Sequence, residues 1–169
     1  MIHPRFRIIF IALLLVFSLS QCITIGSAVE NDSVVEQKSA STRMLVIDYA
    51  KDLLGTPYRY GGTDKRGFDC SGFTSYVMKK VDVKMSRTSR SQALEGEKVK
   101  LKDAKPGDLV FFKRSSMGKV FHVAIVINNS RNKLEVIHST SRGVVIDNIS
   151  DSKYWHPKIW VVKDILSDS

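Results

Sequence analysis

The sequence predicts an α+β domain in which helices come first and an antiparallel sheet of about five strands follows. Apolar residues keep helical spacing up to about residue 80, and beyond about residue 105 the apolar period switches to two. Helices followed by consecutive strands are typical of α+β proteins with an antiparallel sheet. The 169 residues suffice for one hydrophobic core and are too few for two ordinary domains.

The first 28 residues have the pattern of an export signal. Arg5 and Arg7 precede an apolar run from Ile8 to Val16, and small residues follow it. The run is too short for a comfortable membrane span. Residues 1–28 are therefore expected to direct the domain out of the cytoplasm, to the periplasm or cell envelope.

The signal has two alternative exits. The small residues 26–28 fit cleavage after Ala28, which leaves a mature chain beginning at Val29. Alternatively, residues 19–22 (Leu-Ser-Gln-Cys) resemble a bacterial lipoprotein box, in which Cys22 is acylated and anchors the protein to the membrane. The glutamine departs from that box, because a small residue is expected at its position.

The remaining chain divides into a tether and a domain. Residues 29–42 are polar and lack periodicity, which predicts a flexible tether, and the domain is expected over residues 43–165. Loss of residues 1–28 removes two arginines and no acid, so the net charge falls from +9 to +7. Export, and the lack of interleaved aromatic and basic residues, argue against a nucleic-acid partner.

The first helix of the domain is expected to begin at a cap on Ser41 or Thr42 and to stop at Gly55. The apolar positions that keep its helical spacing are Met44, Ile47, Ala50 and Leu54. Residues 56–67 hold a proline and a glycine pair, and they are predicted to form a loop.

Asp69 is expected to cap a second helix that runs from Cys70 to about Lys80, and a shorter helix is expected over residues 89–95. Residues 105–108 (Lys-Pro-Gly-Asp) predict a turn that leads into the sheet. The predicted strands are residues 109–112, 121–127, 133–140, 143–149 and 158–163.

Cys70 is the candidate nucleophile, because it is the one cysteine of the expected domain. On the first turn of a helix, unpaired backbone N–H groups and the helix dipole favour a thiolate. The charge of the capping Asp69 opposes this effect. Many lone cysteines are small buried hydrophobes, so a nucleophilic role requires a base, normally a histidine, beside the thiol.

Two of the three histidines in the domain are expected on neighbouring strands. If residues 128–132 form a hairpin loop without a bulge, His122 lies directly opposite His138, with Cβ atoms roughly 4.5–5.5 Å apart. One imidazole then takes the Cys70 proton and the other fixes its tautomer. His156 is predicted to lie in a turn with a structural role. A zinc site is disfavoured, because no second cysteine or close histidine pair has ligand spacing.

Six short motifs occur in order along the domain. They are Gly55–Gly62 (GTPYRYGG), Phe68–Phe73 (FDCSGF), Arg87–Ser89 (RTS), Pro106–Phe112 (PGDLVFF), His122–Ile125 (HVAI) and Ile137–His138. With these motifs the sequence resembles the NlpC family of bacterial cell-wall cysteine peptidases over about residues 43–163. The resemblance implies a reduced papain-like core.

The family resemblance also implies an activity. Its members hydrolyse peptidoglycan stem peptides, commonly between D-Glu and the diamino acid that follows. By this resemblance Cys70 is the nucleophile, His122 the general base and His138 the residue that orients it. The resemblance implies no metal or organic cofactor, and we expect a monomer whose basic surface assists association with anionic wall polymers.

Four further residues match the family in the substrate site. Tyr58 is expected beside the cysteine, where it helps to shape the oxyanion site. Asp69 and Ser71 are expected to meet the free amine of a stem peptide that has lost its glycan. Arg87 has two interpretations of equal weight, one in the substrate site and one structural.

Two other functions remain open. The same papain-like core could act as an amidase that cuts between muramic acid and L-Ala. A different class is a catalytically silent wall-binding module, against which the complete set of Cys70, His122 and His138 argues.

Overall fold

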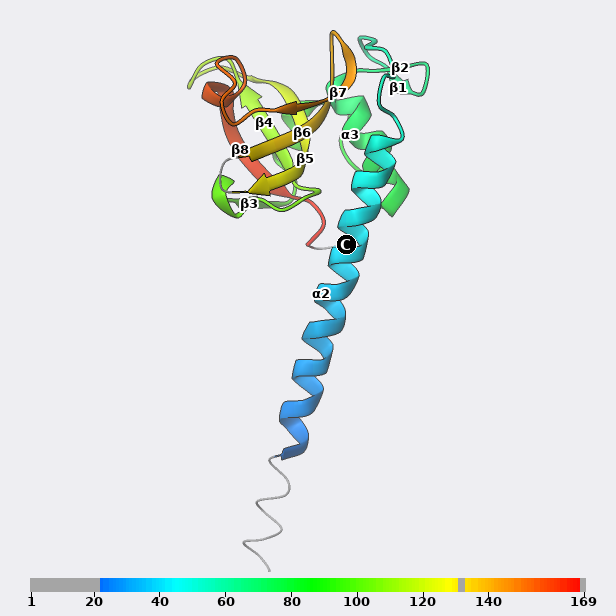
Figure 1. Ribbon diagram of the computed structural model, residues 1–169, viewed down its shortest axis with the longest axis vertical. Coiled ribbons are helices and arrows are strands. Elements are labelled where there is room, and N and C mark those ends of the chain that lie inside the picture. Colours follow the sequence, from blue (N-terminus) through cyan, green and yellow to red (C-terminus); the bar gives the residue numbers. More distant parts are fainter. Residues whose placement is uncertain (1–21, 131–132, 168–169) are drawn as a thin grey trace, which may run out of the picture. The chain divides into compact units, whose positions relative to one another are not determined.

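A computed structural model describes residues 22–130 and 133–167 of the chain (Figure 1). It divides into two units, residues 1–38 and residues 39–169, and the second unit is the folded domain. The predicted export signal falls mainly on residues 1–21, outside the described part, so its cleavage or lipidation stays a prediction. Within the described ranges, no helix combines the length and the apolar character needed to cross a bilayer.

Helix α2 (Cys22–Lys51) is longer than the helix predicted from the sequence. It passes without interruption through residues 29–42, the segment for which the sequence predicts a flexible tether. Residues 27–54 contain neither proline nor glycine. No residue that disrupts helices therefore interrupts this segment. The predicted cap at Ser41 or Thr42 consequently lies inside the helix.

The buried face of α2 differs from the predicted one. Met44 and Leu54 are 64% and 47% exposed. The buried residues of this segment are Arg43, Val46, Ile47, Ala50 and Leu53. The face is rotated because Arg43 turns inward, where its guanidinium binds Asp108 at 2.7 Å and Asp164 at 2.6 Å. Gly55 has a φ of +79°, which fits its predicted role of ending the helical segment.

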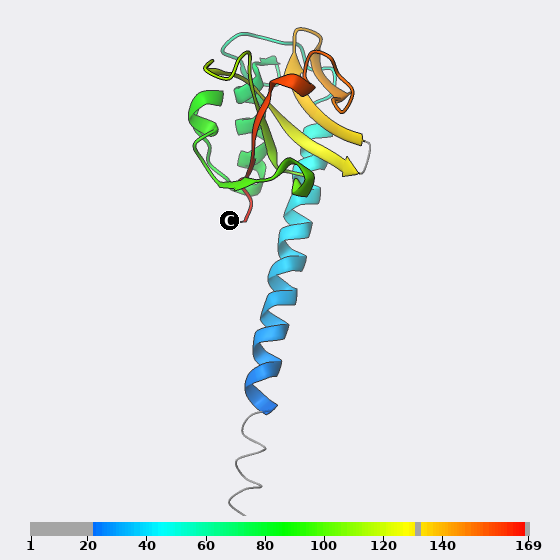
Figure 2. The same cartoon turned by 90° about the vertical axis from the view of Figure 1, so that its left-hand side faces the viewer.

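A six-stranded antiparallel sheet forms the centre of the domain, in the order β3-β8-β4-β5-β6-β7 (Figures 1 and 2). Its strands are β3 (Glu97–Val99), β4 (Leu109–Lys113), β5 (Val120–Ser130), β6 (Lys133–Thr140), β7 (Gly143–Asn148) and β8 (Ile159–Asp164). The five predicted strands are present. The edge strand β3 was missed, because two exposed charged residues and one half-buried valine give no apolar alternation.

Both faces of the sheet are covered. Phe111 packs in a cluster with side chains of α2 and of α3 (Cys70–Met78), and Figure 1 shows α3 lying along the sheet. Phe112 points the other way, into a cluster that contains Ala104 with Trp155 packed against it. This double burial explains why β4 reads as the continuous apolar run Leu-Val-Phe-Phe rather than as an alternating strand.

Short elements complete the domain. They are β1 (Thr63–Asp64), β2 (Gly67–Phe68), α4 (Ser89–Gln92) and the 3₁₀ helices η1 (Lys79–Val81), η2 (Leu101–Asp103) and η3 (His156–Lys158). The predicted loop over residues 56–67 thus contains half of a small hairpin. The predicted turn at residues 105–108 is confirmed: Gly107 has a φ of +93° and the Asp108 N–H donates to the Lys105 carbonyl.

The register of the β5–β6 hairpin is not the predicted one. Ile125 pairs with Ile137, a bulge at Ile127 shifts the ladder, and Ser130 pairs with Lys133. The strands therefore extend into the expected five-residue loop. His138 is consequently not directly opposite His122, because the Ile125–Ile137 register continues with His138 opposite Ala124. His122 lies two residues before Ala124 in β5, on the same face. The two rings still meet diagonally, 5.1 Å apart between centroids.

The start of α3 approaches the preceding loop so closely that two positions require glycine. The Asp69 N–H donates to the Gly62 carbonyl, and a Cβ on Gly72 would lie 2.0 Å from that carbonyl oxygen. A Cβ on Gly62 would lie 2.2 Å from the carbonyl oxygen of Gly67. Loop and helix therefore pack backbone against backbone around Cys70.

We expect Gly72→Ala to destabilise the domain by about 1–3 kcal/mol, because the methyl group would collide with backbone rather than with a mobile side chain. Thermal unfolding measures this change. The matched control is Gly118→Ala, whose nearest neighbour is the Ser115 side chain at 3.0 Å, and which should unfold close to the parent. Equal stability of the two variants would contradict the tight approach.

Candidate active site

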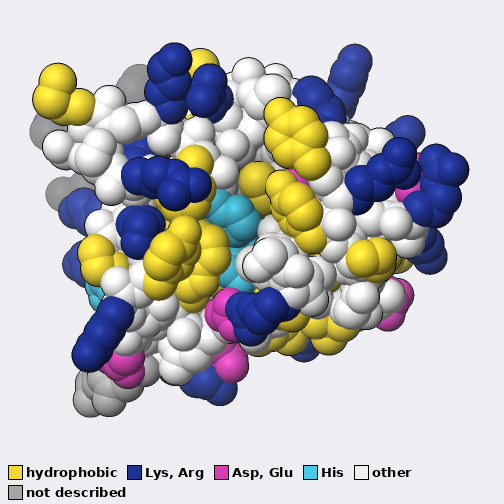
Figure 3. All heavy atoms as spheres, turned by 90° about the horizontal axis from the view of Figure 1, so that it is seen from above, with side chains coloured by type: hydrophobic (Ala, Val, Ile, Leu, Met, Phe, Trp, Pro, Cys, Tyr) yellow, Lys and Arg dark blue, Asp and Glu magenta, His cyan; other side chains and the backbone are white. Residues whose placement is uncertain are grey.

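Cys70 lies where two surface cavities meet. The first cavity, of about 560 Å³, also contains Asp69, Ser71 and Arg87 in its wall. The second, of about 510 Å³, contains His122. Tyr58 and Phe121 line both cavities, as Cys70 does. In Figure 3 histidine side chains lie at the bottom of a hollow with aromatic or apolar and basic side chains around it.

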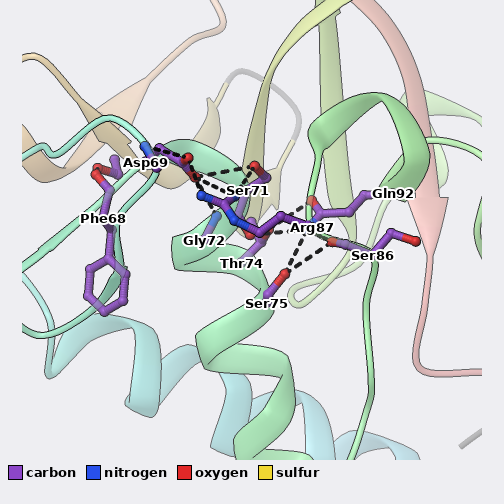
Figure 4. Close-up of polar contacts among 11 residues, drawn as sticks. Phe68, Asp69, Ser71, Gly72, Thr74, Ser75, Ser86, Arg87 and Gln92 are labelled. Carbon is purple, nitrogen blue, oxygen red and sulfur yellow. Dashed lines mark hydrogen bonds and ion pairs between the residues drawn. The ribbon is translucent and has the colours of Figure 1, made fainter.

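The Asp69 carboxylate holds the first turn of α3 in place (Figure 4). It accepts the Gly72 N–H at 2.7 Å as the predicted N-cap, and it also accepts the Gly61 N–H at 3.1 Å. The Arg87 guanidinium donates to both of its oxygens, at 3.1 and 2.6 Å, and donates to the Ser71 hydroxyl. Arg87 is therefore a structural partner of Asp69 and also part of the cavity wall.

Gln92 keeps the Arg87 segment against α3 (Figure 4). Its buried amide donates to the Ser71 carbonyl at 3.0 Å and to the Ser86 carbonyl at 2.9 Å. The amide oxygen accepts the Thr74 hydroxyl at 2.9 Å. This role was not predicted, because a glutamine in a short polar helix has no distinctive sequence pattern.

Tyr58 is held beside the nucleophile by backbone pairing. It forms a parallel bridge with Phe68, and the flanking Pro57 and Arg59 bond the backbone of the same residue. Burial, together with the neighbouring Cys70 and Asp69, raises the pKa of the Tyr58 hydroxyl. Tyr58 therefore stays a neutral hydrogen-bond donor at the junction of the two cavities.

The environment of Cys70 favours the thiol. Burial raises the pKa of the thiol above its ordinary value, and the charge of Asp69 raises it further. Backbone N–H groups of Val123, Ser71 and Cys70 itself oppose this and do not overcome it. The helix dipole was expected to favour a thiolate, but the helix start alone does not produce one. The sulfur therefore needs a base during attack.

A chain of hydrogen bonds runs back from His122. Its Nε2 lies 3.0 Å from Nδ1 of His138, and Nε2 of His138 lies 3.0 Å from Oδ2 of Asp147. The Arg142 guanidinium binds the same Asp147 oxygen at 2.5 Å. His138 is fully buried and His122 nearly so, hence neither ring can exchange these partners freely for water.

The protonation states of this chain follow from its last member. Burial raises the pKa of the Asp147 carboxyl, but bonds to His138 and Arg142 outweigh it and the net direction is downward, so Asp147 is an acceptor. Burial lowers the pKa of both histidines, and for His122 the His138 ring lowers it further. Neutral His138 therefore donates from Nε2 and accepts at Nδ1. His122 then donates from Nε2, which leaves its Nδ1 as the basic atom.

Aromatic side chains surround the His122 ring. The Trp155 ring lies 4.7 Å from it and the Phe112 ring 5.7 Å, between centroids. This apolar enclosure is the desolvation that keeps the imidazole neutral. His156 lies apart from both cavities, in η3, where its Nδ1 contacts the Ser150 carbonyl. Across residues 22–130 and 133–167, no three His, Cys, Asp or Glu side chains gather as metal ligands would.

Comparison with known proteins identifies the family. The NlpC/P60 family matches residues 55–164, which is more than half of the chain. The chain belongs to the NlpC/P60 family. The resemblance predicted from the motifs around Cys70 and the two histidines is thereby confirmed.

Two relatives with names are similar to this NlpC/P60 chain. The Gamma-DL-glutamyl hydrolase of Bacillus subtilis is 44% identical over 115 residues, which are 66% of this chain and 27% of the hydrolase. The Probable endopeptidase NlpC of Escherichia coli is 41% identical over 113 residues, 66% of this chain and 70% of the relative. The chain thus spans about a quarter of the first relative's length and more than two thirds of the second's.

A solved structure supports the α+β fold. The NlpC/p60 domain of the peptidoglycan hydrolase SagA is 30% identical, with a TM-score of 0.61 over 72% of this chain and 97% of that domain. The predicted papain-like α+β class is therefore confirmed. The chain is a member of a family of peptidoglycan hydrolases whose named members include endopeptidases.

Asp147 is the functional candidate that the sequence analysis missed. The register of β6 and β7 pairs His138 with Val145 and Val136 with Asp147, so Asp147 lies diagonally across from His138 on one face. The predicted strands 133–140 and 143–149 leave only a two-residue turn between them, which sets this register. The signal was therefore present in the sequence.

We expect Asp147→Ala to lower kcat by roughly 10- to 100-fold with little change in KM, because His138 would lose the acceptor that fixes its tautomer. Asp147→Asn retains an oxygen acceptor and should keep more activity. Steady-state kinetics with thermal unfolding as a folding control measures both variants. A rise in KM with no fall in kcat would contradict a positioning role.

The lowered pKa of His122 predicts the acid limb of the rate profile. The base acts in its neutral form, and a lowered pKa means that protonation requires a lower pH, so kcat/KM should fall only below pH 6.5.

Alkylation of Cys70 by iodoacetamide should accelerate only in the alkaline range, since its thiol pKa is raised above 9.0. A fast alkylation plateau at neutral pH would instead reveal a resting thiolate–imidazolium pair.

Proposed function

We propose that this NlpC/P60 domain is a cysteine endopeptidase that hydrolyses peptidoglycan stem peptides, at the bond between D-Glu and the diamino acid. The observation that supports it best is the half-buried Cys70 at a helix start, facing a cavity shared with His122, whose ring is bonded to His138. The relative named as a Gamma-DL-glutamyl hydrolase favours a γ-glutamyl bond, and the relative named as an endopeptidase favours a bond within a peptide.

Acylation begins with proton transfer. As the Cys70 sulfur attacks the carbonyl carbon, its proton passes to Nδ1 of His122, and the carbonyl oxygen takes the negative charge. Backbone N–H groups at the start of α3, with the Tyr58 hydroxyl beside them, are the donors available to that oxygen. Collapse breaks the C–N bond, and His122 gives its proton to the departing amine, which leaves a thioester on Cys70.

Deacylation reuses the same base. Neutral His122 takes a proton from water, and the resulting hydroxide equivalent attacks the thioester carbon. Collapse breaks the C–S bond, and the sulfur recovers its proton from His122. Neutral His138, held by Asp147, keeps the His122 ring oriented in both halves of the reaction.

The acyl side of the substrate fits the first cavity. A free N-terminal amine of the stem peptide would meet the Asp69 carboxylate and the Ser71 hydroxyl, both in that wall. Burial raises the pKa of Asp69, but bonds from Arg87 and the Gly72 N–H give a net lowering, so the carboxyl is ionised. An incoming amine would share this carboxylate with Arg87.

The location of the reaction is also a proposal. The basic and apolar start of the sequence favours export to the periplasm or cell envelope, where peptidoglycan lies, either free after cleavage at Ala28 or anchored through a lipidated Cys22. Mass analysis of the mature N-terminus distinguishes the two forms.

We expect Cys70→Ala to lower the digestion of purified peptidoglycan by at least about 10³-fold, because Cys70 supplies the only thiol in the lining of the two cavities. His156→Ala is the matched control, since His156 lies outside both cavities, and it should digest at the parent rate. Mass spectrometry of the products identifies the bond. Free L-Ala–D-Glu dipeptides support the proposal, whereas intact stem peptides released from glycan would indicate the amidase, and unchanged digestion by Cys70→Ala would exclude a thiol peptidase.

A further inference from the structure

We propose that Trp155 is a positioning residue for the reaction: its ring covers both imidazoles, keeps water away from them and so preserves the His122–His138 hydrogen bond. The inference rests on the proposed peptidase function, in which neutral His122 is the base, and it deepens that function. In this role Trp155 takes no part in the making or breaking of bonds. It acts through the two histidines.

Among the described residues, Trp155 is the one aromatic side chain outside the histidine pair whose ring packs against both imidazoles. Its centroid lies 4.7 Å from that of His122, at an interplanar angle of 31°, and 5.0 Å from that of His138, at 55°. The rings of Phe112 and Phe121 pack against His122 alone. Figure 3 shows hydrophobic side chains directly beside the histidines in the hollow. Trp155 therefore covers the contact between the two imidazoles rather than one ring.

Short-range contacts hold the Trp155 ring in this place. Its backbone N–H donates to the Ser152 hydroxyl at 3.0 Å, and its carbonyl accepts the Lys158 N–H at 3.0 Å. The Tyr154 ring stands edge-on to the Trp155 ring, 4.8 Å away between centroids, and the Lys158 ammonium lies 3.7 Å from the centre of the Tyr154 ring. Residues 152–158 thus form a local unit between β7 and β8 that carries the indole without belonging to a strand of the sheet.

The bond between the two histidines depends on the exclusion of water. It joins Nε2 of His122 to Nδ1 of His138 at 3.0 Å, and both rings are buried. A water molecule admitted beside these nitrogens would find polar partners there and would compete for the bond that fixes the His122 tautomer. It would also solvate the imidazolium and favour protonation of the base. Without the indole, His122 would therefore lose both its fixed orientation and its neutral state.

Charged and titratable groups from several elements surround His122. They are His138 with Asp147 behind it, and the groups that share the wall of the second cavity with His122, namely Tyr58, Cys70, Arg114, Arg142 and Tyr154. Burial is the largest cause of the lowered pKa of His122, and the His138 ring is the second. Trp155 supplies part of that burial, so its removal weakens the first cause and leaves the second in place.

The experiment compares Trp155→Ala with Trp160→Ala as the matched control. Trp160 lies in β8, is 45% exposed, packs against the Lys113 ammonium at 3.7 Å and lines neither cavity. The pKa of His122 is measured in the parent and in each variant by NMR titration of the histidine side chains, in the absence of substrate. Thermal unfolding is the folding control, and the pH profile of kcat/KM gives a second readout.

We expect Trp155→Ala to raise the ratio of protonated to neutral His122 at a given pH by about tenfold, because water replaces the indole and the pKa moves up toward 6.5. The base acts in its neutral form, so a raised pKa means that activity is lost at a higher pH, and the acid limb of kcat/KM moves up with it. Contacts of Trp155 with the substrate in the second cavity would change the height of the profile and not the position of this limb. Trp160→Ala should titrate as the parent does.

An unchanged His122 titration in folded Trp155→Ala would overturn the proposal. Lower thermal stability and lower activity at every pH, without movement of the limb, would show that Trp155 only stabilises the fold. If Trp155→Ala does not fold, Trp155→Phe decides, because its smaller ring covers less of the imidazoles: a smaller rise of the pKa in the same direction supports the proposal, and an unchanged pKa overturns it. A parent protein that cleaves no peptidoglycan would instead refute the peptidase function, and the titration, which needs no substrate, would still decide whether Trp155 shields His122.

Discussion

The whole site depends on one half-buried carboxylate, Asp69. It accepts hydrogen bonds from a loop N–H, a helix N–H, a hydroxyl and both ends of the Arg87 guanidinium. Through these bonds three separate segments meet at the first turn of α3, where Cys70 lies. The same negative charge raises the pKa of the thiol. Asp69 therefore fixes the position of the sulfur and also makes the resting sulfur less reactive.

The burial of His122 provides a neutral base for this neutral thiol. The rings around His122 lower its pKa, and the base is therefore neutral when the neutral thiol attacks. Asp147 then determines which nitrogen of each ring bears a proton, because an ionised carboxylate can only accept. Nucleophile and base are thus matched as an uncharged pair, and charge develops only along the reaction path.

The sequence predicted the parts of this site whose positions are set by local rules. The cap at Asp69, the turn at residues 105–108 and the strands that hold both histidines follow from short-range chemistry. The bulge at Ile127 did not, since residues 123–127 are a continuous apolar run in which an inserted residue leaves no mark, and the bulge shifted the histidine register. The inward Arg43 was likewise hidden, because its two carboxylate partners are more than 60 residues away in sequence.

Arg43 also holds the two ends of the domain together. Its guanidinium bonds Asp164 at the end of β8 as well as Asp108 at the start of β4, so the first and last elements of the domain are fastened side by side. Arg43 lines neither of the cavities that meet at Cys70. A domain whose chain enters and leaves at one point can be inserted between unrelated domains without disturbing the two cavities. This topology suits a portable catalytic cassette, and the Bacillus subtilis relative, of which the matched region is 27%, shows that such a cassette occurs within a longer protein.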